Sequence, residues 1–297
     1  GSAADVAAVR TAIDAGTLNA TVRFDAVILE DDDTASATEV SAVANPTGFD
    51  PLSVDVSDLA TITGAADEVL ATYGLGNVVA GNLGDETIEL TEAGNSIAAD
   101  KLLSVVDLVK TSSGIVDASS VTSISGTYVK VNGVVAASSD DLTTNGAYAV
   151  EITDNVADAA ADKLKAIIDD TTGSKDFKTV AKITGSVDDL LAIVRDNKTD
   201  LKVGVEFTAN DAGTAAEVGE LKAATSGTVE ATVSDKDIST LLDATTGLVA
   251  QGASATDKLT IELDDTTANA KDLLALNSVT SETVDASKVA TLTGTYS

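Results

Sequence analysis

Apolar and polar residues alternate in two stretches of the chain. In residues 259–263 the apolar positions are Leu259, Ile261 and Leu263, and in residues 203–207 they are Val203, Val205 and Phe207. Period-two alternation is typical of a strand with one buried face. The pattern therefore predicts a strand in each stretch, with these apolar side chains facing the core.

A different spacing predicts short helices. Leu102, Leu103, Val106 and Val109 form one apolar stripe at helical spacing in an otherwise polar stretch. Similar short patterns occur at residues 161–164, 188–193, 216–218 and 271–274. Helices of about ten residues are marginal alone, so we expect them to pack on a sheet.

Two sequence markers recur along the chain. The first is a short strand carrying a glutamate, which returns at a nearly regular interval of roughly 60 residues, the mark of a repeat architecture: Glu30, Glu89, Glu151, Glu206 and Glu262. The second is a hydrophobic segment that ends in Thr-Gly or Ser-Gly, at residues 59–64, 121–126, 180–185 and 289–294. Residues 237–242 stand where the fourth repeat would carry it. The recurrence predicts a repeat protein.

Strands that alternate with short helices indicate parallel strands joined by helical connections. Because a similar strand–helix pattern recurs, we predict an α/β repeat solenoid, with parallel strands on one side and short helices on the other. The array is expected to run through residues 1–297 without a break. Its approximate units are 3–64, 65–126, 127–185, 186–240 and 241–297. The alternative is a conventional α/β domain with one parallel sheet.

Two local patterns predict turns. Asn132-Gly133 carries the signature of a tight hairpin, so we expect a β-hairpin insertion at about residues 127–137. The glycines that end the second marker are expected to be turn residues able to adopt a positive φ; they are Gly64, Gly126, Gly185 and Gly294.

Composition excludes several functions. The chain has no His or Cys, which excludes Ser-His-Asp and Cys-His triads, the usual zinc sites and disulfides. Its net charge of −30 would repel nucleic acids and anionic membranes, and no apolar stretch is long enough for membrane insertion. The 44% of hydrophobic residues indicates a folded core and not a disordered chain.

Acidic residues follow the marker strands. Asp33, Glu92, Asp154 and Asp265 each stand three positions after a marker glutamate, whereas the fourth repeat has Ala209 there. We interpret these acids as caps of the following helix. The alternative is a calcium site, for which the candidates are Asp31, Asp32, Asp33, Asp154, Asp264 and Asp265. No segment matches the twelve-residue calcium loop. We therefore expect no cofactor, and Ca²⁺ stays as the alternative.

Paired carboxylates could also hydrolyse glycosidic bonds, in a cleft usually lined by aromatic side chains. The four tyrosines lie far apart in the sequence: Tyr73, Tyr128, Tyr148 and Tyr296. We therefore assign no catalytic or cofactor-binding residue and expect a protein that is not an enzyme. A polysaccharide-active enzyme on a solenoid scaffold stays as an alternative.

Residues 225–231, 271–276 and 283–289 resemble the acidic tandem repeats of very large secreted or cell-surface proteins of marine bacteria, notably cyanobacteria. The resemblance implies a piece of a longer array that serves adhesion, surface coating or motility on a bacterial surface. Its partners would be neighbouring repeats of the same chain, surface polysaccharide or another cell-surface protein. A calcium-dependent adhesin is the nearest alternative. An array interrupted after residue 297 is expected to expose an apolar end.

Overall fold

The computed structural model describes residues 2–18, 26–27, 33–44, 54–56, 59–75, 85–110, 113–138, 140–196 and 198–294. The chain divides into two compact units. Unit 1 is Gly1–Glu151 with Thr171–Gly173, and unit 2 is Ile152–Asp170 with Ser174–Ser297. Each unit is described by itself.

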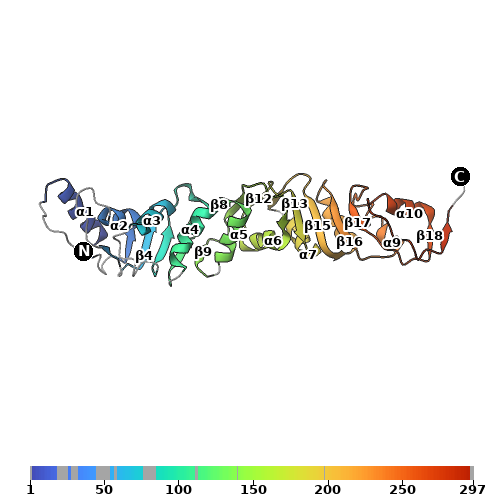
Figure 1. Cartoon of the computed structure of the whole chain (residues 1–297), viewed down its shortest axis with the longest axis horizontal. Helices are drawn as coiled ribbons and strands as arrows, with labels where there is room; N and C mark the ends of the chain where they lie inside the picture. Colours follow the sequence, from blue (N-terminus) through green and yellow to red (C-terminus); the bar gives the residue numbers. More distant parts are fainter. Residues whose placement is uncertain are drawn as a thin grey trace. The chain divides into compact units, whose positions relative to one another are not determined.

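Unit 1 alternates short strands with short helices (Figure 1). In chain order its elements are α1 (Ala3–Asp14), β1 (Ala26–Val27), β2 (Thr34–Ser36), α2 (Ala37–Ala44), β3 (Val54–Asp55), β4 (Thr61–Gly64), α3 (Ala66–Tyr73), β5 (Thr87–Leu90), the 3-10 turn η1 (Ala93–Asn95), β6 (Ser96–Ala98), α4 (Ala99–Val109), β7 (Ile115–Ala118), β8 (Ser123–Gly126), α5 (Tyr128–Ala137), β9 (Leu142–Thr144) and β10 (Ala149–Ile152).

The strands of unit 1 pair in parallel at a regular interval along the chain. One sheet has the order β2-β4-β5-β7-β9, β6 pairs with β8 and β8 with β10, and β1 pairs with β3. Ile62 lies opposite Ile88, which lies opposite Val116. These partners are roughly 25 residues apart, within the range of the short repeats that build solenoids. We call the segment between a residue and its pairing partner on the next strand a coil.

The core of unit 1 lies between the strands and the helices. The central residues Ile62, Ile88 and Val116 are fully buried, whereas Thr61 and Thr63 on either side of Ile62 are only partly buried. Along the chain, α2 contacts α3, α3 contacts α4, and α4 contacts α5. Period-two strands and amphipathic helices thus bury their apolar sides against each other.

Unit 2 repeats this alternation of strands and helices. Its elements are β11 (Ala159–Ala160), α6 (Ala161–Asp170), β12 (Lys175–Phe177), β13 (Lys182–Gly185), α7 (Val187–Arg195), β14 (Thr199–Leu201), β15 (Glu206–Gly213), α8 (Ala215–Ala223), β16 (Val229–Val233), α9 (Ile238–Leu241), β17 (Lys258–Thr260), β18 (Thr267–Asn269), α10 (Ala270–Asn277) and β19 (Thr291–Thr293).

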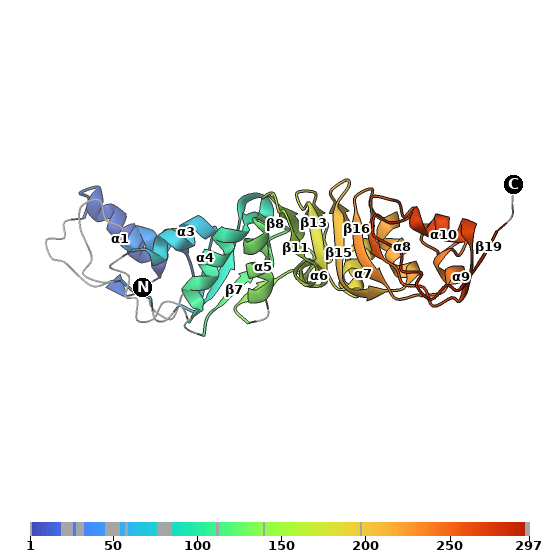
Figure 2. The ribbon, with the colours of Figure 1, turned by 45° about the vertical axis from the view of Figure 1, so that its right-hand side comes forward.

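Parallel pairing also organises unit 2. The larger sheet has the order β11-β13-β15-β16-β17, and β12–β14 and β18–β19 form further pairs. Ile183 lies opposite Phe207, which lies opposite Val229, and the register shifts between Thr208 and Ala212 of β15. Figure 2 shows β13, β15 and β16 side by side, and α7 contacts both β15 and α8.

These features confirm an α/β fold with parallel strands. Leu259, Ile261 and Leu263 are buried as predicted, and the apolar stripe of residues 102–109 lies on α4. The marker strands of residues 87–90 and 150–153 correspond to β5 and β10. The marker strand at residues 27–30 lies mostly outside the described residues.

The predicted hairpin at residues 127–137 is wrong, because this segment forms the helix α5. Thr127 caps the helix by accepting a hydrogen bond from the Lys130 amide, and the Asn132 side chain donates to the Tyr128 carbonyl. A Cβ atom added at Gly133 would lie 2.9 Å from Cδ1 of Leu103 in α4. Gly133 therefore permits close helix packing and does not form a turn.

The strand predicted for residues 203–207 is wrong at its first apolar position. Val203 is 92% exposed in a turn, in which Gly204 has φ +74°, and β15 begins only at Glu206. Val205 and Phe207 are buried as predicted. Because Val203 lies in the turn and not in the strand, its side chain does not face the core with Val205 and Phe207.

Candidate functional site

Carboxylates reach from one coil to the helix of the previous coil. Each accepts a hydrogen bond from the backbone amide of the first residue of that helix. The four pairs are Glu92 with Ala66 of α3 (2.6 Å), Asp211 with Val187 of α7 (2.7 Å), Asp235 with Ala215 of α8 (2.7 Å) and Asp265 with Ile238 of α9 (2.8 Å). We call these the inter-coil caps.

An inter-coil cap satisfies a helix amide that has no partner within its own helix. The negative charge also lies at the positive end of the helix dipole, which stabilises both groups. A side-chain cap of this kind is worth about 1 kcal/mol. The acid is therefore committed to the neighbouring coil through the oxygen that accepts the hydrogen bond.

Two of these four helices, α7 and α8, also have a side-chain cap from the residue just before the helix. Ser186 accepts a hydrogen bond from the Asp189 amide in α7, and Thr214 accepts one from the Glu217 amide in α8. The Glu217 carboxylate accepts in turn from the Thr214 amide at 2.8 Å. The local cap and the inter-coil cap thus satisfy different amides of one helix terminus.

The prediction that the acids cap the following helix is therefore wrong in direction for Glu92 and Asp265. Both cap a helix that precedes them, by 26 and 27 residues. In the fourth repeat, where the sequence has Ala209, the role belongs to Asp211 two positions later. Sequence reasoning also missed Asp235. Asp211 and Asp235 could have been identified by their spacing, because each inter-coil cap is an acid 20 to 27 residues after the first residue of the helix that it caps.

The glycines that end the second marker form another contact between coils. A Cβ atom added at Gly126 would lie 2.8 Å from Cβ of Ala99, and one at Gly185 would lie 2.4 Å from Cβ of Ala161. Gly64 faces Ala37 in the same way. None of the four marker glycines has a positive φ, so their interpretation as turn residues is wrong. At Gly64, Gly126 and Gly185 a larger side chain has no room, because the first residue of the previous helix lies against the glycine.

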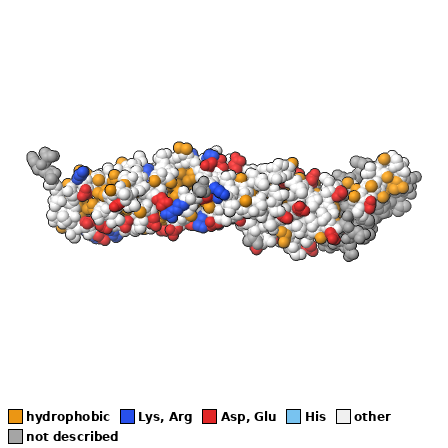
Figure 3. Space-filling view, turned by 180° about the vertical axis from the view of Figure 1, so that it is seen from behind, with side chains coloured by type: hydrophobic (Ala, Val, Ile, Leu, Met, Phe, Trp, Pro, Cys, Tyr) orange, Lys and Arg blue, Asp and Glu red, His pale blue; other side chains and the backbone are white. Residues whose placement is uncertain are grey.

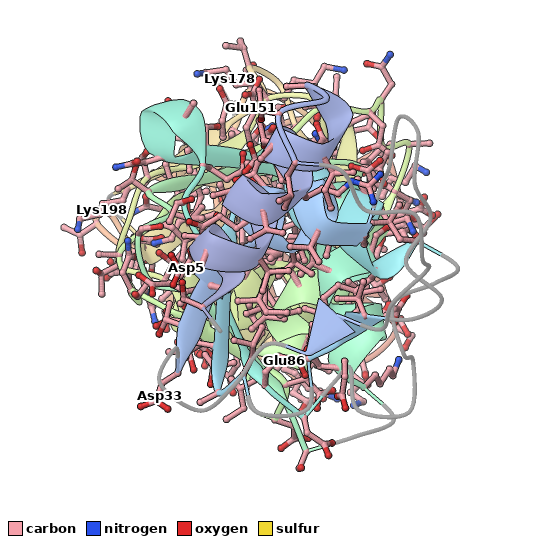
Figure 4. The ribbon with its side chains drawn as sticks, turned by 90° about the vertical axis from the view of Figure 1, so that its left-hand side faces the viewer. Asp5, Asp33, Glu86, Glu151, Lys178 and Lys198 are labelled. Atoms are coloured by element: carbon pink, nitrogen blue, oxygen red, sulfur yellow. The ribbon has the colours of Figure 1, made fainter. Side chains whose placement is uncertain are left out.

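The candidate calcium ligands do not converge where the structure describes them. Asp31 and Asp32 lie outside the described residues. Asp33 is exposed, and Figure 4 shows it at the edge of unit 1, with its side chain pointing away from the ribbon. Asp154 lies in the loop after β10. Within the described residues, no group of three or more acidic side chains is arranged to hold a metal ion.

Asp264 and Asp265 already have other partners. Asp265 is the inter-coil cap of α9, and Asp264 accepts a hydrogen bond from Lys288. Lys288 also lies 2.9 Å from Glu262, whose other oxygen is 2.7 Å from Lys236. Adjacent coils are thus joined by an ion-pair cluster of Lys236, Glu262, Lys288 and Asp264.

This ion-pair cluster shifts the ionisation of its members. Hydrogen bonds from Lys236 and then Lys288 lower the pKa of Glu262 to about 2. Hydrogen bonds to Asp264 and Glu262 raise the pKa of Lys288. The cluster lies at the surface, so dissolved salt weakens it.

In unit 2 one further ion pair is buried and another is partly buried. Lys222 lies 3.0 Å from Asp257, which is fully buried and also accepts from the Val229 and Ser254 amides. Lys175 lies 2.7 Å from Asp196. Burial alone would raise the pKa of Asp196, but hydrogen bonds from Lys175 and its other neighbours outweigh burial and lower it. These pairs hold successive coils together from the inside.

The surface carries mixed charge and shallow hollows. On the face drawn in Figure 3, acidic and basic side chains lie intermixed. A hollow of about 540 Å³ in unit 2 is lined by Asp158, Asp162 and Asp189 with Thr184, but Asp158 is paired with Lys182 at 2.7 Å. Tyr73 donates a hydrogen bond to Glu86 at 2.6 Å, and Tyr148 is buried, so neither offers an open aromatic platform.

Among the described residues, the helices are too short or too polar to span a membrane. Comparison with known proteins gives no relative: the chain matches no family model, and neither the curated proteins nor the solved structures contain a significant match.

Proposed function

We propose that the chain is a structural repeat module, an α/β solenoid that belongs to a large secreted or cell-surface bacterial protein. It would act as an acidic scaffold for adhesion, surface coating or motility. The observation that carries the proposal is the inter-coil cap: in both units a carboxylate of one coil completes the helix of the previous coil.

The strand register supports the solenoid. In each unit, strands pair in parallel with partners roughly 25 residues away, which is a usual length for one solenoid repeat. Neighbouring helices also contact each other in chain order. A chain in which each coil is covered mainly by the next coil can be lengthened by adding coils. The number of coils in such a chain sets its length and the area of the surface that it presents.

The charge supports a role outside the cell. A net charge of −30 keeps a chain soluble and separate from its copies, and it repels other anionic surfaces when salt is low. At the ionic strength of sea water the Debye length is shorter than about 8 Å, so repulsion between exposed acidic side chains farther apart is largely screened. The ion pairs between coils oppose part of this repulsion within the fold.

Thermal unfolding in different salts tests the proposal. The chain is melted in NaCl and in CaCl₂ at equal ionic strength, and again after a chelator is added. The scaffold proposal predicts that both salts raise the Tm by the same amount, because screening alone stabilises the acidic chain. A larger increase in millimolar CaCl₂ that the chelator reverses would replace the proposal with the calcium-dependent adhesin.

An activity assay tests the second alternative. The chain is incubated with neutral and anionic polysaccharides, and the release of reducing ends is measured. The scaffold proposal predicts no release above that of a heat-denatured sample. Turnover that disappears when one pair of neighbouring carboxylates is changed to amides would replace it with the polysaccharide-active enzyme.

A further inference from the structure

One turn of unit 1 contains an asparagine followed by a glycine. The pair is Asn145-Gly146, which follows β9 (Figure 1), and Gly146 has a φ of +65°. The exposed Asn145 side chain donates a hydrogen bond from Nδ2 to the Val121 carbonyl at 2.7 Å, and its Oδ1 accepts one from the Ala147 amide at 2.8 Å. One side chain thus closes its own turn and holds the previous coil. We call this arrangement a turn clip.

Three other turn clips in the described residues are built with threonine. In each, the hydroxyl donates to a carbonyl of an earlier strand or loop and accepts from the amide two residues later. They are Thr171 with Tyr148 and Gly173, Thr225 with Val205 and Gly227, and Thr280 with Leu259 and Glu282. A hydroxyl group therefore makes both hydrogen bonds of a turn clip. The carboxamide of Asn145 adds a reactivity that the clip does not require.

The turn at Asn145 favours attack of the chain on this carboxamide. When glycine follows asparagine, the glycine nitrogen can reach the side-chain carbonyl carbon, because no glycine side chain obstructs the approach. The Gly146 amide makes a long hydrogen bond of 3.4 Å to Thr144 Oγ1, which costs little to break. The Ala147 amide donates to Oδ1, where negative charge develops during the attack, and such a donor stabilises that charge.

We infer that Asn145 is a site of spontaneous deamidation, a modification that the chain performs on itself. The Gly146 nitrogen forms a bond to Cγ of Asn145, the bond between Cγ and Nδ2 breaks, and ammonia leaves with the proton of the Gly146 amide. Water then opens the cyclic imide at one of its two carbonyl carbons, which gives aspartate or isoaspartate. The reaction consumes only water and does not depend on the proposed scaffold role.

Deamidation removes the donor of this turn clip. In the aspartate product a carboxylate oxygen replaces Nδ2 opposite the Val121 carbonyl, so two acceptors face each other and the hydrogen bond is lost. In isoaspartate the main chain runs through the former side chain, which lengthens the connection between β9 and β10. Both products also add a negative charge to a chain of net charge −30. The modification therefore loosens the contact between these coils.

A second Asn-Gly pair, Asn132-Gly133, is protected by the helix α5. Helical geometry gives the Gly133 amide a carbonyl acceptor within the helix. The Asn132 side chain donates to the Tyr128 carbonyl at 2.9 Å. Reaction at Asn132 requires local opening of α5, which costs free energy. The same dipeptide thus provides an internal reference for Asn145.

Ageing of the full chain followed by tandem mass spectrometry tests the inference. The chain is kept in a mildly alkaline buffer and digested with trypsin, which releases both asparagines in one peptide, residues 131–163. Fragment ions assign the mass gain of deamidation to each position. We expect Asn145 to convert at least about tenfold faster than Asn132, because only Asn132 must wait for a helix to open.

The isolated peptide of residues 131–163 is the reference for the chemistry. A short helix is marginal without its tertiary contacts, so both Asn-Gly pairs should react at similar rates in this peptide. Equal rates at Asn145 and Asn132 in the folded chain, or an Asn145 that stays unmodified while the peptide reacts, would overturn the inference.

Two variants test the effect on the fold. N145T builds the turn clip as Thr171 and Thr225 do, so it should match the Tm of the fresh chain and keep that Tm on ageing. N145D introduces the deamidated side chain at once and should have a lower Tm than N145T. The Tm of the unmodified chain should fall with age toward that of N145D. If N145T loses as much stability on ageing, or N145D melts like the fresh chain, deamidation does not loosen this turn and the inference fails.

Discussion

At the scale of single residues, close approach between coils leaves no room for a side chain at Gly185. A Cβ atom there would lie 2.4 Å from Cβ of Ala161. We predict that G185A lowers the free energy of unfolding by about 1–3 kcal/mol, since overpacking forces the backbone to shift. Urea denaturation followed by circular dichroism measures this change.

Gly294 provides the control for G185A. It ends the same marker, but an added Cβ atom would lie 3.6 Å from Cβ of Ala270, an ordinary contact distance. G294A should therefore change the free energy of unfolding much less than G185A. Equal effects of the two substitutions would contradict the proposed role of the marker glycines.

The ionisation of Glu262 predicts how stability depends on pH. Lys236 and Lys288 lower its pKa to about 2 in the folded chain, below the value of about 4.3 in an unfolded chain. The stabilisation is therefore fully present above about pH 4.3 and is lost as the pH falls toward 2. We predict that E262Q has a lower Tm than the unmodified chain at pH 6, and that most of this difference is lost by about pH 2.

E89Q is the control for the loss of one negative charge, because Glu89 is an exposed glutamate in the other unit. It should not lower the Tm at pH 6. A difference between E262Q and the unmodified chain that stays constant from pH 6 to pH 2 would show that the ion-pair cluster does not act through the charge of Glu262.

Residue chemistry was only partly predictable from the sequence. The acids after the marker strands could be recognised in the sequence. Asp265, however, caps a helix that begins 27 residues earlier, and neither the sequence around Asp265 nor that of the helix indicates this contact. The buried pair of Lys222 and Asp257 was not predicted, because two charged residues 35 positions apart carry no periodic signal. Which charged side chains become buried depends on how coils stack.

At the scale of elements, the inter-coil caps predict that a helix depends on a residue outside it. We predict that D235A lowers the free energy of unfolding by about 1 kcal/mol, since the Ala215 amide at the start of α8 loses its acceptor. Hydrogen exchange should become faster in the first turn of α8, although that turn begins 20 residues before the substitution.

Asp140 provides the charge-matched control for D235A. It is exposed in unit 1, between α5 and β9, so D140A removes one negative charge far along the chain from α8. D140A should not change exchange in α8. If D235A speeds exchange only around residue 235 and leaves α8 protected, the inter-coil cap does not stabilise that helix.

Elements with a clear period were predictable, and elements decided by packing were not. The apolar stripe of α4 led to the correct helix. The alternation at Leu259, Ile261 and Leu263 correctly gave the buried side chains, but the strand β17 covers only Lys258–Thr260, and Glu262 forms an isolated bridge. The helix α5 was mistaken for a hairpin because Asn132-Gly133 is a strong local turn signal. Its Gly133 is required by Leu103 of the neighbouring helix, and a tertiary contact of that kind overrides the local signal.

At the scale of the whole molecule, the α/β class and the parallel strands followed from the alternation of strand and helix patterns. The sequence markers recur at roughly 60 residues, whereas paired strands lie roughly 25 residues apart, so each sequence repeat would contain two coils. Helical patterns that occur twice between successive marker glutamates, as at residues 161–164 and 188–193, indicate this doubling in the sequence. The strand sequences in successive coils differ, as in Thr87–Leu90 and Ile115–Ala118.

The central claim, that coils are interchangeable units of a solenoid, is tested most directly by deleting one coil in register. Thr87 pairs with Ile115, so removal of residues 87–114 joins Glu86 to Ile115 and brings β7 into the place of β5 beside β4. The control removes only residues 87–100. It joins Glu86, just before β5, to Lys101, the third residue of α4, so the strand that should pair with β4 is replaced by a helix and the register is lost.

Far-UV circular dichroism and thermal unfolding compare the two deletions. The account predicts that the longer deletion keeps the α/β spectrum and a cooperative transition. Its stability should fall by about 1 kcal/mol for the lost Glu92 cap, whereas the shorter deletion should lose cooperative unfolding in unit 1. If the longer deletion disrupts the fold as completely as the shorter one, the coils are not interchangeable and the solenoid proposal is contradicted.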